Sequence, residues 1–422
     1  MKVTLVSRVA YYRFAALALH RAGLLERYVC EPMLPVAPGP LSMVPPLERR
    51  LRRRVCPEVG GLPLRRLWAA QLASSTVQVA ARSVCRERSS APALRARLWE
   101  ADALLRTPWR QARPGDALHL MVGMGPHLAS AARRRGIAVV GDVRSFAPAV
   151  RARLTTDVLG TRGISYRSPD EALTRRVLEE LDRVDFVVCN SHATAASYVE
   201  VGLDATRIAV VYPGTDVDTF HPAEQEPSVF TVLFAGRDPL GKGVLDLLDA
   251  ARALSPRSRV LISSPADRRI GAHPSTGAQV GFIGQVPAPE MPGLLRRVSV
   301  LVLPSLSDGF GLVALEAMAS GLPVVVSDRC GVAELVTDGV DGFVVPAADP
   351  DALADRLRRL EADRDLRRRI GAAARRTALT HSWYRYGEDL LACYRRWFGV
   401  PVEREVSPAP AAPGAAQAPG GS

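Results

Sequence analysis

The sequence has very little lysine. It contains 422 residues and 55 basic side chains, of which only Lys2 and Lys242 are lysine. Cysteine is also sparse: the six cysteines are scattered without a CxxC pair, which argues against a disulfide framework or a zinc site and indicates reduced thiols. Charged residues interrupt the apolar runs near residue 1, so we expect neither a signal peptide nor a membrane span there. These absences favour a cytoplasmic protein.

Acidic side chains are scarce in the first half of the chain. Residues 1–200 carry 31 basic and 17 acidic side chains, whereas the remainder carries 24 and 26. The arginines are densest at residues 48–67, with further clusters at Arg82, Arg86 and Arg88 and at residues 133–135. Such a surface attracts anionic lipid headgroups or an acidic substrate, although a solvated arginine-rich face fits the same count. Few aromatic residues separate these arginines, so we expect no nucleic-acid partner.

Short apolar runs alternate with segments of helical periodicity along the whole chain. Ten runs are typical of buried strands: residues 3–7, 117–123, 137–143, 184–191, 208–214, 231–236, 259–264, 280–284, 300–305 and 323–328. This alternation predicts an α/β fold with parallel sheets and helices on both faces. Ligands are then expected at the carboxyl ends of the strands.

A turn-rich, polar stretch at residues 213–229 suggests a hinge between two doubly wound domains. We expect an N-terminal domain at residues 1–212 and a C-terminal domain at residues 213–383. A C-terminal helix is expected at residues 384–401. The Pro/Ala/Gly-rich tail, residues 402–422, should be disordered.

The stretch GRDPLGKG, residues 236–243, contains one of the two lysines. It lies between a strand-like run and a helical segment, and a strand, a glycine loop and a helix together favour anion binding. The stretch also matches the first seven positions of a P-loop, but Gly243 stands where that motif needs Ser or Thr for magnesium. An ordinary strand-to-helix turn remains an alternative, and the compact ammonium of Lys242 favours a phosphate site.

Two carboxylates follow the run at residues 300–305. Asp308 lies in the glycine-flanked loop DGFG, and Glu316 is the only charge among the apolar residues of the next helical segment. A carboxylate in such surroundings needs partners, which ligand hydroxyls would supply. A helix cap at Asp308 and a hydrated surface position for Glu316 are the plainer alternatives.

Several segments within residues 183–397 resemble one enzyme family when they are taken in order. They are NSHATAASYVEVGLDATRIAVVYPGTDVDTF, FAGRDPLGKG, FIGQVPAPEMPGLLRRVSVLVLPSLSDGFGLVALEAMASGLPVVVSD, GVAELVTDGVDGFVVPAADPDALADRL and HSWYRYGEDLLACYRRW. They resemble the retaining, nucleotide-sugar-dependent glycosyltransferases of family 4, also called group 1. The resemblance implies the two-domain B-type (GT-B) fold, in which the parallel sheets of two Rossmann-like domains face a central cleft. Residues 1–180 share with this family only the alternation of predicted strands and helices.

The resemblance also implies roles for the charged residues. An arginine and a lysine after the first strand of the second domain neutralise the donor diphosphate in this family, and Arg237 and Lys242 match them. Glu316 matches the carboxylate that binds the donor ribose. Asp308 matches the carboxylate beside the transferred sugar, with the usual seven intervening residues but with aspartate in place of glutamate. We therefore take Arg237, Lys242 and Asp308 as catalytic candidates.

Backbone and acceptor-side positions follow from the same resemblance. The loop N–H groups expected near the phosphate and sugar belong to Gly309, Phe310, Gly311 and Leu312, and the nucleobase is expected to pack on Gln285 and Val286. The first domain lacks the glycine-rich loop and the histidine that many members have. Its acceptor-side candidates are His119, Asp142 and Arg144.

The sequence therefore predicts a retaining hexosyltransferase that acts in polysaccharide, glycolipid or other glycoconjugate biosynthesis. The donor would be a UDP-, GDP- or ADP-sugar, and the acceptor a hydroxyl of a glycan, a lipid-linked sugar or a small molecule. We expect no cofactor and no metal, because the histidines are scattered and no DxD ends a strand. We expect a cytoplasmic protein, and the arginine-rich face is compatible with peripheral association at the inner face of the plasma membrane. A non-catalytic sugar-nucleotide-binding or membrane-scaffold protein of the same fold is the alternative.

Overall fold

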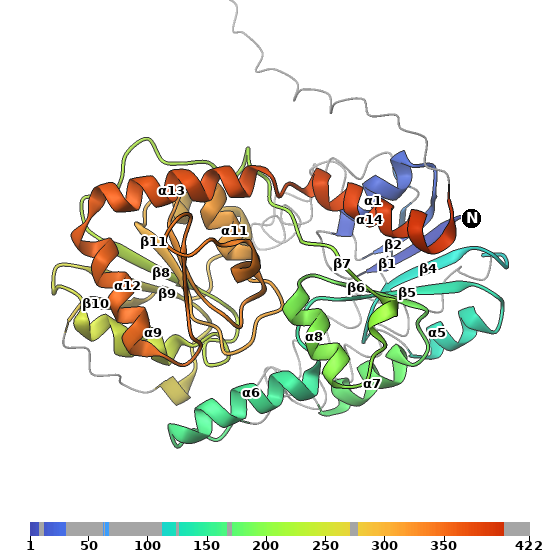
Figure 1. Cartoon of the computed structure of the whole chain (residues 1–422), viewed down its shortest axis with the longest axis horizontal. Coiled ribbons are helices and arrows are strands. Elements are labelled where there is room, and N and C mark those ends of the chain that lie inside the picture. Colours follow the sequence, from blue (N-terminus) through green and yellow to red (C-terminus); the bar gives the residue numbers. More distant parts are fainter. Residues whose placement is uncertain are drawn as a thin grey trace, which may run out of the picture.

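The computed structural model describes residues 1–7, 12–30, 62, 64–66, 112–123, 126–166, 171–270 and 277–400. Most of the arginine-rich stretch at residues 48–67 lies outside these ranges, as do Arg82, Arg86, Arg88 and the tail at residues 402–422. The described chain forms two α/β domains that lie side by side (Figure 1).

The first domain is built on a parallel sheet of seven strands, in the order β3-β2-β1-β4-β5-β6-β7. The strands are β1 (Val3–Ser7), β2 (Leu25–Cys30), β3 (Leu64–Arg66), β4 (Ala117–Met121), β5 (Ala138–Val143), β6 (Phe186–Cys189) and β7 (Ile208–Val210). The helices of this part are α1 (Tyr12–Arg21), α5 (Pro126–Arg133), α6 (Pro148–Thr161), α7 (Glu171–Leu181) and α8 (His192–Glu200).

The second domain has a parallel sheet of six strands, in the order β10-β9-β8-β11-β12-β13. The strands are β8 (Thr231–Ala235), β9 (Arg259–Ser263), β10 (Gln279–Phe282), β11 (Val300–Leu303), β12 (Val324–Ser327) and β13 (Phe343–Val345). The helices are α9 (Val244–Ala250), α10 (Met291–Leu295), α11 (Leu312–Ala319), α12 (Pro350–Ala362) and α13 (Arg364–Leu379), and α14 (Trp383–Phe398) follows them. Two parallel Rossmann-like sheets confirm the predicted fold class.

Alternate residues of the central strands face two separate apolar cores. In β8, Val232 and Phe234 join the core beneath α9 and α12, whereas Leu233 and Ala235 join the core beneath α10 and α11. Successive side chains of a strand point to opposite faces of the sheet, so a strand that is covered on both faces needs an unbroken apolar run. This is why Val232 to Ala235 are all apolar and why the sheet forms the middle layer.

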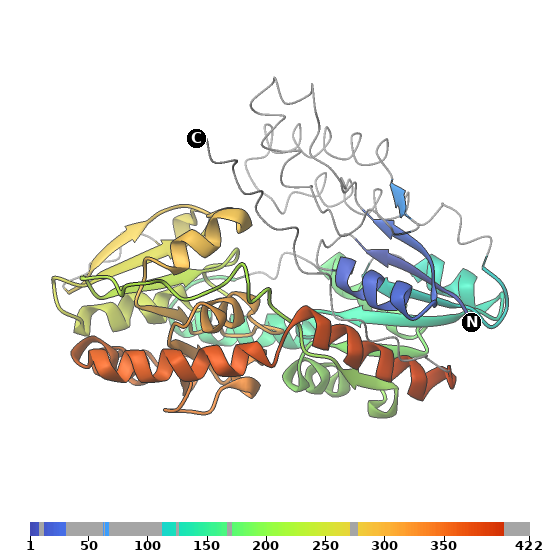
Figure 2. The same cartoon turned by 90° about the horizontal axis from the view of Figure 1, so that it is seen from above.

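The chain passes twice between the two domains. The first crossing follows β7, and the second joins α13 to α14, which continue one another along the edge of both domains (Figures 1 and 2). The two crossings are bonded together, because the Thr215 N–H donates to the His381 carbonyl at 2.9 Å. Gly214 lies so close to the second crossing that an added Cβ would come 2.2 Å from the Ser382 carbonyl carbon. The hinge is therefore a narrow, two-stranded connection.

Helix α14 packs on α1 of the first domain. Its buried Tyr386, Leu390 and Tyr394 share one apolar core with Tyr12 and Leu19. The last helix thus returns to the first domain, where its tyrosine hydroxyls reach polar groups of β4 and β5.

Three strands were missed in the sequence. Strand β2 has the sequence LERYVC, in which Glu26 and Arg27 break the apolar pattern, and β3 and β13 have only three residues each. Among the described helices, none combines the length and the apolar composition that a membrane crossing requires.

Candidate functional site

The loop after β8, residues 236–243, is held in one conformation. The Asp238 carboxylate accepts the Gly241 N–H at 3.2 Å, and the Asp238 carbonyl accepts the Lys242 N–H at 2.9 Å. Gly243 has a φ of 74°, and an added Cβ there would lie 1.9 Å from the Pro304 carbonyl oxygen. Only glycine fits this left-handed, closely packed position, so the loop fixes where Arg237 and Lys242 emerge.

The two cations of this loop differ in their surroundings. Arg237 is exposed, and its guanidinium has no hydrogen-bond or ion-pair partner in the described part of the chain. The Lys242 ammonium forms an ion pair with the Asp308 carboxylate, and both side chains are mostly buried. The structure thus brings two of the predicted catalytic residues into direct contact and leaves the third free to meet an anion.

The loop that contains Asp308 is shaped by glycine. The Asp308 carboxylate accepts the Phe310 N–H at 3.3 Å, and Gly311 is left-handed with a φ of 83°. An added Cβ at Gly311 would lie 2.6 Å from the Cys330 sulfur. The Phe310 side chain is buried in the core beneath α11, which begins at Leu312. Phe310 and Leu312 therefore anchor the loop through their side chains.

Gly309 joins this loop to the first domain. Its carbonyl oxygen accepts hydrogen bonds from the Ser191 hydroxyl at 2.7 Å and the Thr194 hydroxyl at 3.1 Å. An added Cβ at Gly309 would lie 2.3 Å from the Arg144 carbonyl oxygen and 2.7 Å from the Ser145 Cα. The backbones of the two domains thus meet beside Asp308, and a side chain at this position would force them apart.

Glu316 lies on α11, eight residues beyond Asp308. Its side chain is partly exposed, and its carboxylate has no hydrogen-bond or ion-pair partner among the described residues. Burial raises the pKa of Glu316 to about 8, since no neighbouring charge offsets the loss of hydration. Without a ligand the side chain is therefore substantially protonated at neutral pH, and hydroxyl donors would favour its charged form.

Gln285 and Val286 follow β10, at the carboxyl edge of the same sheet. Gln285 is exposed, whereas Val286 packs against the core beneath α11 and donates its backbone N–H to the Ser263 hydroxyl at 3.1 Å. These residues lie in the turn that follows two exposed apolar side chains, Phe282 and Ile283. The turn therefore offers apolar surface to a flat group.

The acceptor-side candidates form a buried network within the first domain. His119 and Asp142 have no exposed surface, and their nearest charged atoms are 3.5 Å apart. Arg144 binds Asp142 through Nε at 2.5 Å and donates to the Tyr386 hydroxyl at 2.9 Å, while the His119 Nδ1 lies 3.0 Å from the Tyr394 hydroxyl. These side chains thus bond to one another and to α14. His119 has no exposed surface that an acceptor could contact.

One interdomain contact was not predicted from the sequence. The Glu334 carboxylate accepts the His192 N–H at 2.9 Å, the Ala193 N–H at 2.7 Å and the Tyr212 hydroxyl at 2.8 Å. A carboxylate of the second domain therefore caps α8 of the first domain. The run NSHAT, a strand end followed by a helix start, was the only signal for this contact.

A second group of contacts joins the end of α6 to the loop at residues 236–243 and to α9. Arg162, at the end of α6, pairs with Asp246 and, at 2.7 Å, with Asp249. The Tyr166 hydroxyl donates to the Asp238 carboxylate at 3.1 Å. Because Asp238 also holds the Gly241 N–H, the first domain touches the loop that carries Arg237 and Lys242.

Comparison with known proteins matches both halves of the chain. A family model described as glycosyl transferases group 1 matches residues 217–377, and one described as Glycosyltransferase Family 4 matches residues 55–219. A D-inositol 3-phosphate glycosyltransferase of Streptomyces scabiei is 31% identical over 311 residues, which cover 65% of this chain and 67% of that protein. The chain belongs to the group 1, family 4 glycosyltransferases.

A second curated relative matches over less of its own length, whereas two solved structures match over nearly all of theirs. The D-inositol 3-phosphate glycosyltransferase of Corynebacterium urealyticum is 32% identical over 275 residues, which cover 58% of this chain and 63% of the relative. Sucrose-phosphate synthase of Thermosynechococcus elongatus has a TM-score of 0.61 at 18% identity and covers 94% of this chain and 99% of its own. HepE of Anabaena, solved with UDP and glucose, has a TM-score of 0.61 at 16% identity, and the match covers 94% of this chain and 100% of HepE. The two structures confirm the GT-B fold.

Proposed function

We propose that this glycosyltransferase moves a sugar from a nucleoside diphosphate donor to a hydroxyl acceptor, with retention at the anomeric carbon. The observation that carries the proposal is the pair of cations on one rigid loop: a free guanidinium at Arg237 and an ammonium at Lys242 that contacts Asp308. Positive charge placed where a diphosphate leaves stabilises the transition state. The likeness to HepE, which was solved with UDP and glucose, supports a nucleotide sugar as the donor.

The remaining site residues receive roles under the same proposal. Glu316 accepts the ribose hydroxyls, the turn at Gln285 and Val286 holds the nucleobase, and the backbone from Gly309 onward faces the sugar and phosphates. By resemblance to the family, the leaving phosphate takes the acceptor proton on the same face, so no protein carboxylate acts as nucleophile. Arg237 and Lys242 supply the charge that a metal ion would otherwise provide, and transfer is proposed to be metal-independent.

The acceptor is proposed to bind between the domains, against the first. Because the His119 and Asp142 side chains are buried, the groups left to face an acceptor are backbone atoms near Arg144 and Ser145, beside Gly309. A lipid-linked or anionic acceptor at a membrane surface fits the excess of basic residues in the first 200 positions. The curated relatives are named for D-inositol 3-phosphate, which is an anionic acceptor candidate.

A nucleotide screen with a transfer assay tests the proposal. We expect one of UDP, GDP or ADP, at about 100 times its Kd, to raise the melting temperature by about 5 to 10 °C. The matching nucleotide sugar should then yield a product of unchanged anomeric configuration by proton NMR, with an equal rate in EDTA. Failure of all three nucleotides to stabilise the protein would overturn the proposal, and binding without transfer would favour a non-catalytic sugar-nucleotide-binding protein.

Exchanging Glu316 for glutamine should have opposite effects on stability and on donor binding. The pKa of Glu316 rises from 4.5 to about 8 on folding, so the folded protein holds this proton more tightly than the unfolded chain. Its contribution therefore becomes increasingly destabilising as pH rises from about 4.5 to about 8. At pH 8 we expect Glu316→Gln to raise the melting temperature of the unliganded protein while weakening nucleotide binding about 10- to 100-fold, because a charge-assisted hydrogen bond is lost.

Glu290→Gln is the matched control, because Glu290 is an exposed glutamate of the same domain. It should leave both the melting temperature and the nucleotide Kd unchanged. Calorimetric titration and a melting series from pH 5 to pH 8 give the two readouts. Wild-type nucleotide affinity in Glu316→Gln would refute the ribose role, whereas a destabilised variant at pH 8 would refute the raised pKa.

A further inference from the structure

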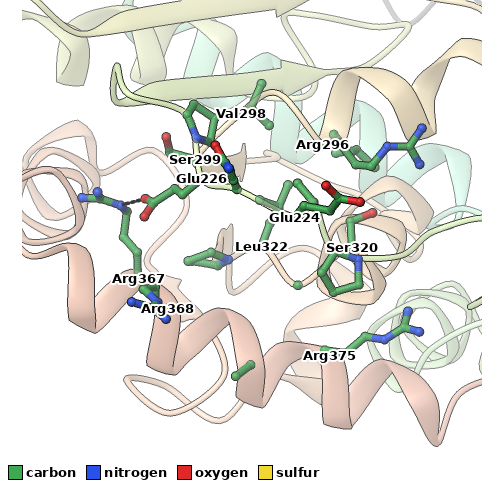
Figure 3. Close-up of a pocket in the computed structure, with 18 of the residues that line it drawn as sticks. Glu224, Glu226, Arg296, Val298, Ser299, Ser320, Leu322, Arg367, Arg368 and Arg375 are labelled. Atoms are coloured by element: carbon green, nitrogen blue, oxygen red, sulfur yellow. Dashed lines mark hydrogen bonds and ion pairs between the residues drawn. The ribbon is translucent and has the colours of Figure 1, made fainter.

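The second domain has a pocket of about 670 Å³ away from the nucleotide loops. Two of its lining residues, Ser299 and Pro323, immediately precede β11 and β12. The pocket therefore lies at the amino edge of the sheet, whereas Lys242 and Asp308 follow the carboxyl ends of β8 and β11. Residues 222–227 of the first crossing form one wall of this pocket and α13 forms the other (Figure 3).

Positive charge predominates around this amino-edge pocket. Its lining includes five arginines and two glutamates: Arg296, Arg364, Arg367, Arg368, Arg375, Glu224 and Glu226. One carboxylate, Glu226, is shared between Arg364 at 2.8 Å and Arg367 at 2.5 Å. A single negative charge between two guanidiniums leaves a local excess of positive charge, which attracts an anion.

Arg368 also lines the pocket, but it takes no part in the ion pairs with Glu226. It is exposed and has no hydrogen-bond or ion-pair partner in the described part of the chain. In Figure 3 it lies beside Arg367, on the same side of the hollow. A planar guanidinium presents several N–H donors in a fork, which matches the oxygens of a phosphate.

The opposite side of the pocket offers a hydrogen-bond acceptor. Figure 3 shows Glu224 and Arg296 on the side away from Arg368. The Glu224 carboxylate has no partner among the described residues, while an Arg296 N–H points to the His221 Nε2 at 3.2 Å. The His221 Nδ1 lies 3.1 Å from the Pro222 carbonyl, which can only accept a hydrogen bond, so Nε2 is the nitrogen that faces Arg296. Glu224 is thus left to accept hydroxyl donors.

The rest of the lining mixes apolar side chains with Gln225, Ser299 and Ser320, and it is firmly held. Leu295, Val298 and Leu322 line it, and the Arg375 guanidinium donates to the Phe220 carbonyl at 2.6 Å and the Val217 carbonyl at 3.0 Å. These bonds fix the first crossing against α13 and keep the pocket formed. Its volume falls within the range of about 300 to 1,000 Å³ that is typical of sites for small molecules.

We propose that this pocket binds a phosphorylated sugar or polyol. The phosphate pairs with Arg368 and with the excess positive charge of Arg364 and Arg367, the hydroxyls donate to Glu224, and the carbon skeleton covers the partly exposed Leu322. The site is separate from the nucleotide site, because it opens at the opposite edge of the sheet.

Calorimetric titration of the full chain with glucose 6-phosphate, inorganic phosphate and glucose tests the proposal. We expect glucose 6-phosphate to bind more tightly than phosphate, and glucose not to bind. Arg368→Gln should weaken glucose 6-phosphate at least tenfold. Glu224→Gln should remove the preference for glucose 6-phosphate over phosphate. Arg369→Gln, an exposed arginine of the same helix that does not line the pocket, should bind like the wild type.

Lys242→Ala separates this pocket from the nucleotide site. We expect this variant to keep its affinity for glucose 6-phosphate. Any of three results would overturn the proposal: no binding by the wild type at millimolar concentration, loss of binding in Lys242→Ala, or equal weakening in Arg368→Gln and Arg369→Gln. Binding of phosphate and glucose 6-phosphate with equal affinity would refute the role given to Glu224.

Discussion

Lys242→Ala is expected to slow sugar transfer by about 100- to 1000-fold, which corresponds to about 2.7 to 4 kcal/mol of lost transition-state stabilisation. The ammonium is held by a rigid loop and contacts Asp308, so its charge is in place before the diphosphate leaves. Steady-state kinetics with the nucleotide sugar identified by the screen measure the change. The melting temperature should change much less than the rate, because Lys242 belongs to neither apolar core of the second domain and its loss opens no cavity there.

Lys2→Ala is the natural control for this experiment, because Lys2 is the only other lysine of the chain. Its ammonium donates to the Gly23 carbonyl at 2.6 Å, at the outer surface of the first domain. The control variant should transfer sugar at the wild-type rate. Turnover within threefold of wild type in Lys242→Ala would show that the leaving diphosphate does not depend on this charge.

Gly309→Ala is expected to reduce kcat/KM by about 100-fold while nucleotide binding stays within a few-fold of wild type. The added methyl would lie 2.3 Å from the Arg144 carbonyl oxygen, and since both neighbours are backbone, the domains must separate. A displacement of about 1 Å at a catalytic site can cost on the order of 100-fold in rate. Nucleotide affinity should survive, because the proposed nucleotide contacts all belong to the second domain.

Gly293→Ala provides the comparison for Gly309→Ala, because an added Cβ at Gly293 would meet no atom within 4 Å. This variant should show wild-type kinetics. Parallel measurements of kcat/KM and of the nucleotide Kd separate a closure defect from a folding defect. If Gly309→Ala turned over normally, the contact between Gly309 and Arg144 would not belong to the catalytic state.

The sequence predicts the centre of each domain better than its edges and interfaces. Unbroken apolar runs such as VLFA and VLVL identify strands that are covered on both faces, and Gly243 and Gly311 mark loops that only glycine can form. Strand β2 escapes this reasoning, because Glu26 and Arg27 give it no apolar pattern. Its pairing with β1 depends on the whole sheet rather than on local residues.

Contacts between distant segments are also beyond local patterns. The family resemblance relates Asp308 to Glu316, but nothing near Lys242 in the sequence indicates that it contacts Asp308, 66 residues away. The hydrogen bonds from Ser191 and Thr194 to Gly309 span even longer separations. His119 shows the same limit: the sequence offered it as an acceptor-side candidate, and only the structure places it within β4, fully buried and 3.0 Å from the Tyr394 hydroxyl.

The bonded pair of crossings at Thr215 and His381 limits how the molecule can open. Neither of the two chain crossings can move without the other, because the hydrogen bond joins them. The two domains can therefore separate only by rotating about this narrow connection. In Figure 1 the crossings lie at one edge of the molecule, and α6 reaches the second domain at the opposite edge. The ion pairs of Arg162 therefore lie at the side of the interface farthest from the crossings, where a small rotation separates the domains most. We expect substrates to enter and leave on that side.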